Sequence, residues 1–183
     1  MEANKPKRYL QLIDSKGDLF NAPDDTVIIH ACNCLGIWGS GIASEFKKKY
    51  PAAYKEHFEY CKVHKENPEE LRGTAQLIAP CEDSGGPCHY VGCLFTSTRY
   101  GKSKDAPVEI LSATEQAMMH LLELVTKSIA EGNNISELRM CLINSGKFGV
   151  PFAETSRVLR TIEIQNENMP HKVTAMARAE EEH

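Results

Sequence analysis

The sequence lacks any long hydrophobic run. No apolar stretch approaches the roughly 20 residues that a membrane-spanning helix needs, and the first residues, MEANKPKRY, lack the apolar segment of a signal peptide. The formal net charge of -4 gives no general attraction to polyanions, so any affinity for an anion has to be local to a site. We therefore expect a protein of the cytosol or nucleus, cytoplasmic by default, with no membrane partner.

The cysteines lack the pattern of a disulfide framework or a zinc site. There are seven of them, an odd number, which fits a reducing compartment. Cys32 and Cys34 lie close together, as do Cys81, Cys88 and His89, but neither set has the paired C-x-x-C spacing of a zinc site. We expect small buried side chains and loop thiols, with no metal and no cofactor.

The chain does contain enough apolar residues for one sizeable core. With 183 residues, 42% of them hydrophobic, it is long enough for one domain and short for two. We predict a single domain over residues 1–183, with a short polar tail from about residue 178.

Alternating strand and helix patterns predict a three-layer α/β/α fold around a central mixed sheet of about six strands. Pro51 is placed to kink or divide the first helical segment. The predicted strands span 9–14, 26–32, 74–79, 90–96, 139–144 and 172–177, and the predicted helices span 42–64, 108–131 and 152–166.

Two glycine-bearing stretches each follow a predicted strand and precede a predicted helix. They are HACNCLGIWGSGIA at 30–43 and INSGKFGVP at 143–151. Loops of this kind bring backbone N–H groups to one end of a sheet and suit the binding of a diphosphate. Either one alone is more typical of a plain strand-to-helix turn, and it is their pairing that favours a binding site. A dinucleotide fingerprint does not fit, because Ser44 stands where the last glycine or alanine of G-x-G-x-x-G belongs.

The first stretch resembles the first ligand loop of the macro domain, the ADP-ribose-binding fold. That loop usually reads N-A-A-N and then a glycine run, so Asn33 matches the second asparagine and His30 replaces the first. The second stretch resembles the family's G-T-G-I-Y-G-Y-P, with Gly146, Phe148, Gly149 and Pro151 in step, and GDLF at 17–20 resembles its G-D-I motif.

Within the family, the first loop and LFTS at 94–97 look most like the fungal ADP-ribose 1''-phosphate phosphatases, whose substrate is a by-product of tRNA splicing. A sister branch of hydrolases frees glutamate side chains of ADP-ribose with a lysine nucleophile and an aspartate. This sequence departs from that branch, because Ser97 and Thr98 occupy the lysine's neighbourhood and Phe148 stands near the aspartate's position.

The resemblance implies roles for individual residues. Asp18 would accept a hydrogen bond from the adenine amino group, with Leu19 beside it, although Asp18 also suits a turn. Asn33, a candidate catalytic residue together with His30, would orient the distal ribose, or alternatively cap its loop. His30 is the candidate acid/base group, with a satisfied core histidine as the alternative. The remaining candidate substrate-binding residues are Trp38, Gly39, Ser40, Gly41 and Ile42 in the first loop and Ser145, Gly146, Lys147, Phe148 and Gly149 in the second.

We expect a phosphatase that converts ADP-ribose 1''-phosphate to ADP-ribose and inorganic phosphate by attack of water without a metal ion. The alternatives are an ADP-ribosyl-protein hydrolase and a non-catalytic ADP-ribose-binding module.

A basic cluster follows the predicted strand 90–96 and consists of Arg99, Lys102 and Lys104. These side chains suit a terminal phosphate. Nucleic acid is the weaker interpretation, because only one aromatic residue, Tyr100, lies among them. We expect a monomer.

Overall fold

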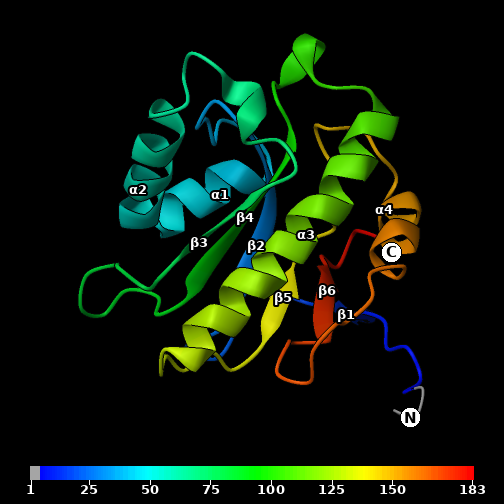
Figure 1. Ribbon diagram of the computed structural model, residues 1–183. Coiled ribbons are helices and arrows are strands. Elements are labelled where there is room, and N and C mark those ends of the chain that lie inside the picture. The colour runs from blue at the N-terminus through cyan, green and yellow to red at the C-terminus, as the bar shows by residue number, and fades with distance from the viewer. Residues whose placement is uncertain (1–4) are drawn as a thin grey trace.

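The computed structural model describes residues 5–183, and within them the chain forms six strands and four α-helices (Figure 1). The elements are β1 (Gln11–Lys16), β2 (Val27–Asn33), α1 (Ile42–Lys49), α2 (Pro51–Lys62), β3 (Ala75–Ile78), β4 (Tyr90–Ser97), α3 (Pro107–Ala130), β5 (Leu138–Met140), α4 (Phe152–Leu159) and β6 (Lys172–Ala177), with 3-10 turns at Pro68–Glu70 and Gly101–Ser103. The expected α/β class is confirmed.

The strands form one mixed sheet in the order β1-β6-β5-β2-β4-β3. All neighbouring pairs are parallel except β3 with β4, which are antiparallel. Strand β2 therefore lies in the middle, between β5 and β4, and the carboxyl ends of these three parallel strands meet at one edge of the sheet. In open α/β sheets this edge is where ligands bind.

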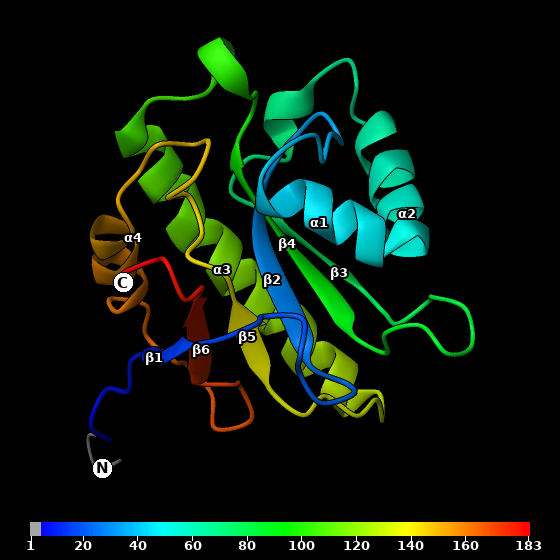
Figure 2. The same cartoon turned by 180° about the vertical axis from the view of Figure 1, so that it is seen from behind.

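Helices cover both faces of the sheet, as the three-layer prediction requires. Helices α3 and α4 lie on one face and α1 and α2 on the other (Figures 1 and 2). Alternate residues of β2 enter different cores: Val27 and Ile29 pack with residues of α3, whereas Ile28 and Cys32 pack with Phe46 and Trp38. Strand β4 is buried along its whole length, which is typical of a central strand of such a sheet.

Several predicted boundaries differ from the structure. Pro51 does divide the first helical segment, because it begins α2 where α1 has ended. The third predicted helix stops at Leu159 instead of 166, because the chain then pairs with the segment before β1: Leu10 N donates to Ile162 O at 2.9 Å and Ile164 N to Arg8 O at 2.7 Å. This pairing also explains why β1 begins at Gln11 and not at residue 9.

The polar tail makes side-chain contacts with the domain, while most of its residues are exposed. Arg178 forms an ion pair with Glu45 of α1, and His183 Nε2 lies 2.9 Å from the Ala175 carbonyl oxygen. These contacts involve side chains of the tail, and they leave the strand order of the sheet as described above. Over the described part of the chain, residues 5–183, no helix combines the length and apolarity that crossing a membrane would require.

Candidate functional site

A pocket of about 730 Å³ opens at the carboxyl ends of β2 and β5. Its volume is within the usual range for a small-molecule site, roughly 300–1,000 Å³. The loop after β2 and the loop after β5 reach this edge from either side (Figure 2). The described residues that line it are Ala31, Cys32, Asn33, Ile37, Trp38, Gly39, Ser40, Gly41, Ile42, Ala43, Tyr100, Cys141, Leu142, Ile143, Asn144, Gly146, Lys147 and Phe148.

The Asn33 side chain organises the first loop from within. A β-bulge at Cys32 and Asn33 ends the regular pairing of β2 with β4. The Asn33 amide nitrogen donates to the Ile37 carbonyl at 2.8 Å, and its amide oxygen accepts from the backbone N–H groups of Leu35 at 3.0 Å and Ile37 at 3.4 Å. The structure thus shows the loop-capping alternative for Asn33, while also placing this residue in the pocket wall. Contact with a ribose stays a prediction.

The first loop ends at the N-terminus of α1, which points its free N–H groups toward the pocket. Gly41 precedes the helix with a φ of 61°, and no described side chain caps this end. A Cβ at Gly41 would meet no heavy atom of the described chain within 4 Å, so the approach to the helix end is open. Uncapped N–H groups and the positive end of the helix dipole favour an anionic group here.

The second loop depends on Asn144, which sequence reasoning did not select. Asn144 is buried and has a φ of 68°, a left-handed conformation that asparagine tolerates better than most residues. Its amide oxygen accepts from Thr96 Oγ1 of β4 at 2.9 Å, and its nitrogen donates to Thr114 of α3 at 2.9 Å and Thr155 of α4 at 3.3 Å. Asparagine just before Ser-Gly in a turn was the signal that could have found it.

The rest of the second loop divides into residues that line the pocket and residues that shape the turn. Gly146, Lys147 and Phe148 line the pocket, as expected. Ser145 and Gly149 do not; the Ser145 hydroxyl donates to the Leu142 carbonyl at 2.5 Å, and Gly149 N donates to the Gly146 carbonyl at 3.1 Å. Gly149 has a φ of 70°, which explains why glycine stands there.

His30 lies behind the pocket wall, which corrects its expected place at the reacting end of the ligand. The side chain is 0% exposed and stacks on Phe46 with ring centroids 4.0 Å apart. Burial lowers the pKa of His30, and the neighbouring His57 lowers it further, so the imidazole is held neutral. A fully enclosed ring is not positioned to exchange a proton with a ligand, and the core alternative fits this geometry.

Trp38 joins that buried group and separates it from the pocket. Its ring lies 4.7 Å from His30, 4.9 Å from His57 and 5.1 Å from Tyr54, measured between centroids. Although Trp38 contributes to the pocket lining, it is only 1% exposed. Its structural effect is to close the pocket floor with an apolar ring.

Asp18 and Leu19 lie in the turn after β1, at the same edge of the sheet but outside the residues that line the pocket. The Asp18 carboxylate accepts a hydrogen bond from the Phe20 N–H at 3.0 Å and is otherwise exposed, whereas Leu19 is buried in the core with Phe46. The turn role of Asp18 is therefore present in the structure, and its contact with adenine stays a prediction.

Hydrogen bonds to an aspartate hold the basic segment after β4, residues 98–105, in place. Asp105 accepts from the Thr98 N–H at 2.9 Å and from Arg72 at 3.1 Å. Tyr100 of this segment lines the pocket, which sequence analysis did not anticipate, while Arg99, Lys102 and Lys104 are exposed and do not line it. Lys104 is nevertheless close to the second loop, since a Cβ at Gly149 would lie 3.8 Å from its Cε.

Comparison with known proteins agrees with this geometry. The macro domain family model matches residues 29–159. The "ADP-ribose 1''-phosphate phosphatase" of Chaetomium globosum is 45% identical over 88% of this chain and 89% of its own length, and the protein of the same name from Aspergillus oryzae is 39% identical over 79% and 85%.

Solved structures show the same fold at low sequence identity. The macrodomain of Mycobacterium tuberculosis DarG superposes with a TM-score of 0.68 at 18% identity, covering 91% of this chain and 97% of that one. Thermosipho africanus DarTG in complex with ADP-ribose superposes with a TM-score of 0.66 at 18% identity, covering 97% of this chain and 44% of that one. The two glycine loops, their common sheet edge and the matching family model together show that this chain belongs to the macro domain family.

Proposed function

We propose that this protein hydrolyses ADP-ribose 1''-phosphate to ADP-ribose and inorganic phosphate. The observation that carries the proposal is the pocket between two loops that offer main-chain donors, in a chain 35% to 45% identical to relatives named "ADP-ribose 1''-phosphate phosphatase". The origin of that substrate in tRNA splicing, and a location in the cytosol or nucleus, stay predictions.

The loops are suited to hold the parts of the substrate that do not react. The diphosphate would lie between the N-terminus of α1 and the residues around Gly146, where main-chain N–H groups and an open approach favour an anion. Phe148, partly buried at the rim, would pack along a ribose. Binding energy from these remote contacts fixes the phosphate monoester for attack, and this positioning is a large share of catalysis.

In the reaction, the oxygen of water forms a bond to phosphorus as the bond between phosphorus and the 1''-oxygen breaks. The leaving oxygen stays on the distal ribose and takes up a proton, which yields ADP-ribose. The residues nearest to this end in the proposed orientation are those of the Asn33 loop, whose geometry the Asn33 amide fixes. His30 is placed to support that loop from the core rather than to donate the proton.

One experiment separates the proposal from its two alternatives. The protein is incubated with ADP-ribose 1''-phosphate and, separately, with glutamate-ADP-ribosylated protein, and the release of phosphate and of ADP-ribose is measured. We expect phosphate from the first substrate. Release of ADP-ribose from modified protein alone would indicate an ADP-ribosyl hydrolase, and binding without either product would indicate a reader of ADP-ribose.

Calorimetry tests the binding step independently of turnover. ADP-ribose is expected to bind well above AMP or NAD, because the two loops surround a diphosphate next to a free distal ribose. Equal affinity for all three compounds would contradict the assignment of the pocket, whatever the turnover measurement shows.

A further inference from the structure

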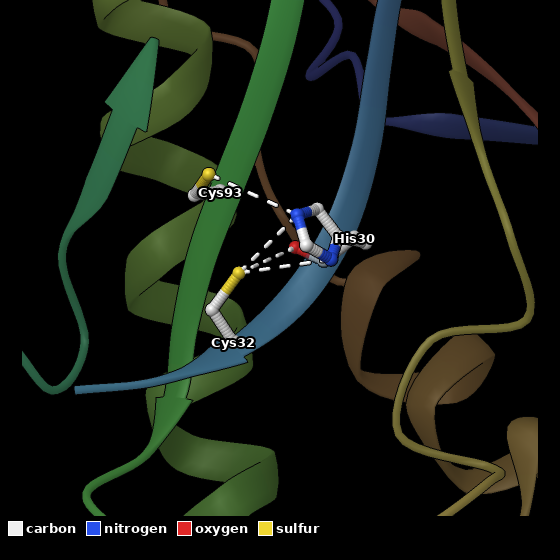
Figure 3. A group of neighbouring side chains, drawn as sticks. All are labelled: His30, Cys32 and Cys93. Carbon is white, nitrogen blue, oxygen red and sulfur yellow. Dashed lines mark hydrogen bonds between the residues drawn. The ribbon is translucent and has the colours of Figure 1, made fainter. Parts of the chain in front are cut away.

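Three side chains able to bind metal meet in the core behind the pocket. They are His30 and Cys32 of β2 and Cys93 of β4, and all three are buried (Figure 3). Cys32 Sγ lies 3.5 Å from His30 Nε2, and Cys93 Sγ lies 3.9 Å from the same nitrogen. One ligand atom from each residue lies within 4.8 Å of the other two.

The sheet itself brings these residues together. His30 is paired with Cys93 in the parallel register of β2 and β4, and Cys32 is two positions further along β2. Because side chains two apart on a strand share a face, all three point into the layer between the sheet and α1. Nothing in the spacing of the cysteines along the sequence could reveal this group, since the strand register creates it.

The spacing of the atoms fits one central cation. Zinc binds sulfur at about 2.3 Å and nitrogen at about 2.0–2.1 Å. With tetrahedral angles, a sulfur and a nitrogen bound to the same ion therefore lie about 3.6 Å apart. The distances of 3.5 Å and 3.9 Å lie on either side of that value. Both sulfur-to-nitrogen distances are therefore within a few tenths of an ångström of the value that a shared cation requires.

The surroundings include a buried N–H donor without a partner. Among residues 5–183, only two buried side-chain nitrogen or oxygen atoms have no hydrogen-bond partner, and one is Trp38 Nε1. The Trp38 ring lies beside the group, with its centroid 4.7 Å from that of the His30 ring. A buried N–H without a partner next to this group would be available to hydrogen-bond a metal-bound sulfur.

We propose that His30, Cys32 and Cys93 bind one thiophilic d10 cation, Zn²⁺ or Cu⁺. Two sulfurs and an imidazole suit these ions and not Mg²⁺ or Ca²⁺, which take oxygen ligands. Binding transfers the two thiol protons to solvent and forms two metal–sulfur bonds and one metal–nitrogen bond. The cation joins β2 to β4 directly behind the Asn33 loop and has a structural role there. This departs from the expectation of a metal-free chain.

The nearby His57 is not counted among the ligands, because its two ring nitrogens have other neighbours. Nδ1 lies 2.9 Å from Gln76 Oε1, and Nε2 lies 3.6 Å from Cys61 Sγ. The site therefore has three protein ligands in the described chain. Three ligands suit Cu⁺, and Zn²⁺ would need a fourth, so the two ions are to be distinguished by measurement.

The test is metal loading of the full chain without oxygen. Reduced protein is treated with a chelator, incubated with Zn²⁺ or Cu⁺ in separate arms, freed of unbound ion, and analysed for metal per chain. We expect about one ion per chain in at least one arm, with release of two protons. Loading with Co²⁺ is expected to give sulfur-to-cobalt charge-transfer absorption, which reports on thiolate ligands directly.

Matched variants locate the ion. Cys93→Ser is expected to reduce the affinity for the ion at least tenfold, while Cys88→Ser, at an exposed cysteine, keeps the wild-type affinity. ADP-ribose binding and circular dichroism verify that each variant is folded. If Cys93→Ser does not fold, Cys32→Ser replaces it as the test variant. Absence of stoichiometric metal from the wild-type chain in both arms overturns the proposal, as does full retention of metal by either folded serine variant.

Discussion

Asn144 Nδ2 donates a hydrogen bond of 2.9 Å to Thr114 Oγ1, which ties the loop after β5 to the N-terminal half of α3. With Thr96 and Thr155 as its other partners, Asn144 connects a strand, two helices and a pocket loop. The glycines leave space for a ligand, but this polar network fixes where the loop stands. In the first loop, Asn33 has the corresponding function through bonds to its own backbone.

Replacing Asn144 is expected to destabilise the domain and weaken ligand binding together. Asn144→Ala leaves three buried threonine hydroxyls without this partner and places a Cβ residue in a left-handed conformation, so we expect a loss of about 2–4 kcal/mol in the free energy of unfolding. Asn144→Gly keeps the backbone freedom and loses the same bonds. Denaturant unfolding of both variants separates the two contributions, and equal stability of all three proteins would contradict the network's importance.

Substitution of Gly146 is expected to affect binding without affecting stability. This glycine lines the pocket, its φ is not in the left-handed region, and an added Cβ would meet no described heavy atom within 4 Å. Gly146→Ala and then Gly146→Val are expected to weaken ADP-ribose binding progressively, by roughly tenfold or more for valine, which is about 1.4 kcal/mol.

Calorimetry and thermal unfolding of the same Gly146 variants measure ADP-ribose affinity and stability separately. An unchanged melting temperature with falling affinity places the diphosphate beside this residue. If valine leaves the dissociation constant unchanged, the second loop does not contact the ligand.

Asp18 provides a test of the adenine contact. Asp18→Ala is expected to weaken ADP-ribose binding by about 1–3 kcal/mol, the range for a lost hydrogen bond to a charged group, without unfolding the domain. Asp18→Asn keeps an oxygen that can accept from the Phe20 N–H, so it controls for the turn. Wild-type affinity in both variants, measured by calorimetry, would leave Asp18 with the turn role alone.

Much of the fold followed from local patterns, whereas the pairing of distant residues did not. The apolar runs of β2 and β4 and the helical spacing of α3 are strong because these elements are buried, and the prediction of six strands was correct. The end of α4 at Leu159 depends on a backbone pairing with residues 8–10. Such a contact leaves no periodic signal in the sequence.

In the site, too, local patterns could be predicted from the sequence and contacts between distant residues could not. Glycine spacing indicated the two loops that line the pocket in the structure, because an open approach, and a positive φ at Gly41 and Gly149, restrict the residue type. Their contact with a ligand stays a prediction. The burial of His30 could not be read in the same way, since a histidine in an apolar run suits either a core or a site. His30 is buried because of tertiary contacts: the strand register pairs it with Cys93, and Phe46 stacks on its ring.

Asn33→Ala is expected to reduce both ADP-ribose affinity and turnover. The substitution removes the three hydrogen bonds that shape residues 33–37, and these bonds exist before any substrate reacts. Asn133→Ala, which alters an exposed asparagine bonded to Ser128, is the matched control and is expected to leave both quantities unchanged. Normal affinity in Asn33→Ala would show that the loop holds its shape without the amide.

His30→Ala distinguishes a structural histidine from a catalytic one. In the core position that the structure shows, the ring stacks on Phe46 and meets Trp38 edge-on. Its removal leaves a cavity, and we expect a loss of about 3 kcal/mol in the free energy of unfolding. Affinity and turnover should then fall together, because the wall behind the Asn33 loop has relaxed. The measurement uses chelator-treated protein, so that packing alone is compared, with His64→Ala as a surface control. The catalytic assignment predicts the opposite pattern: unchanged stability and ADP-ribose affinity, with kcat lower by roughly 10²-fold. That result would show that the enclosed conformation of His30 opens during the reaction.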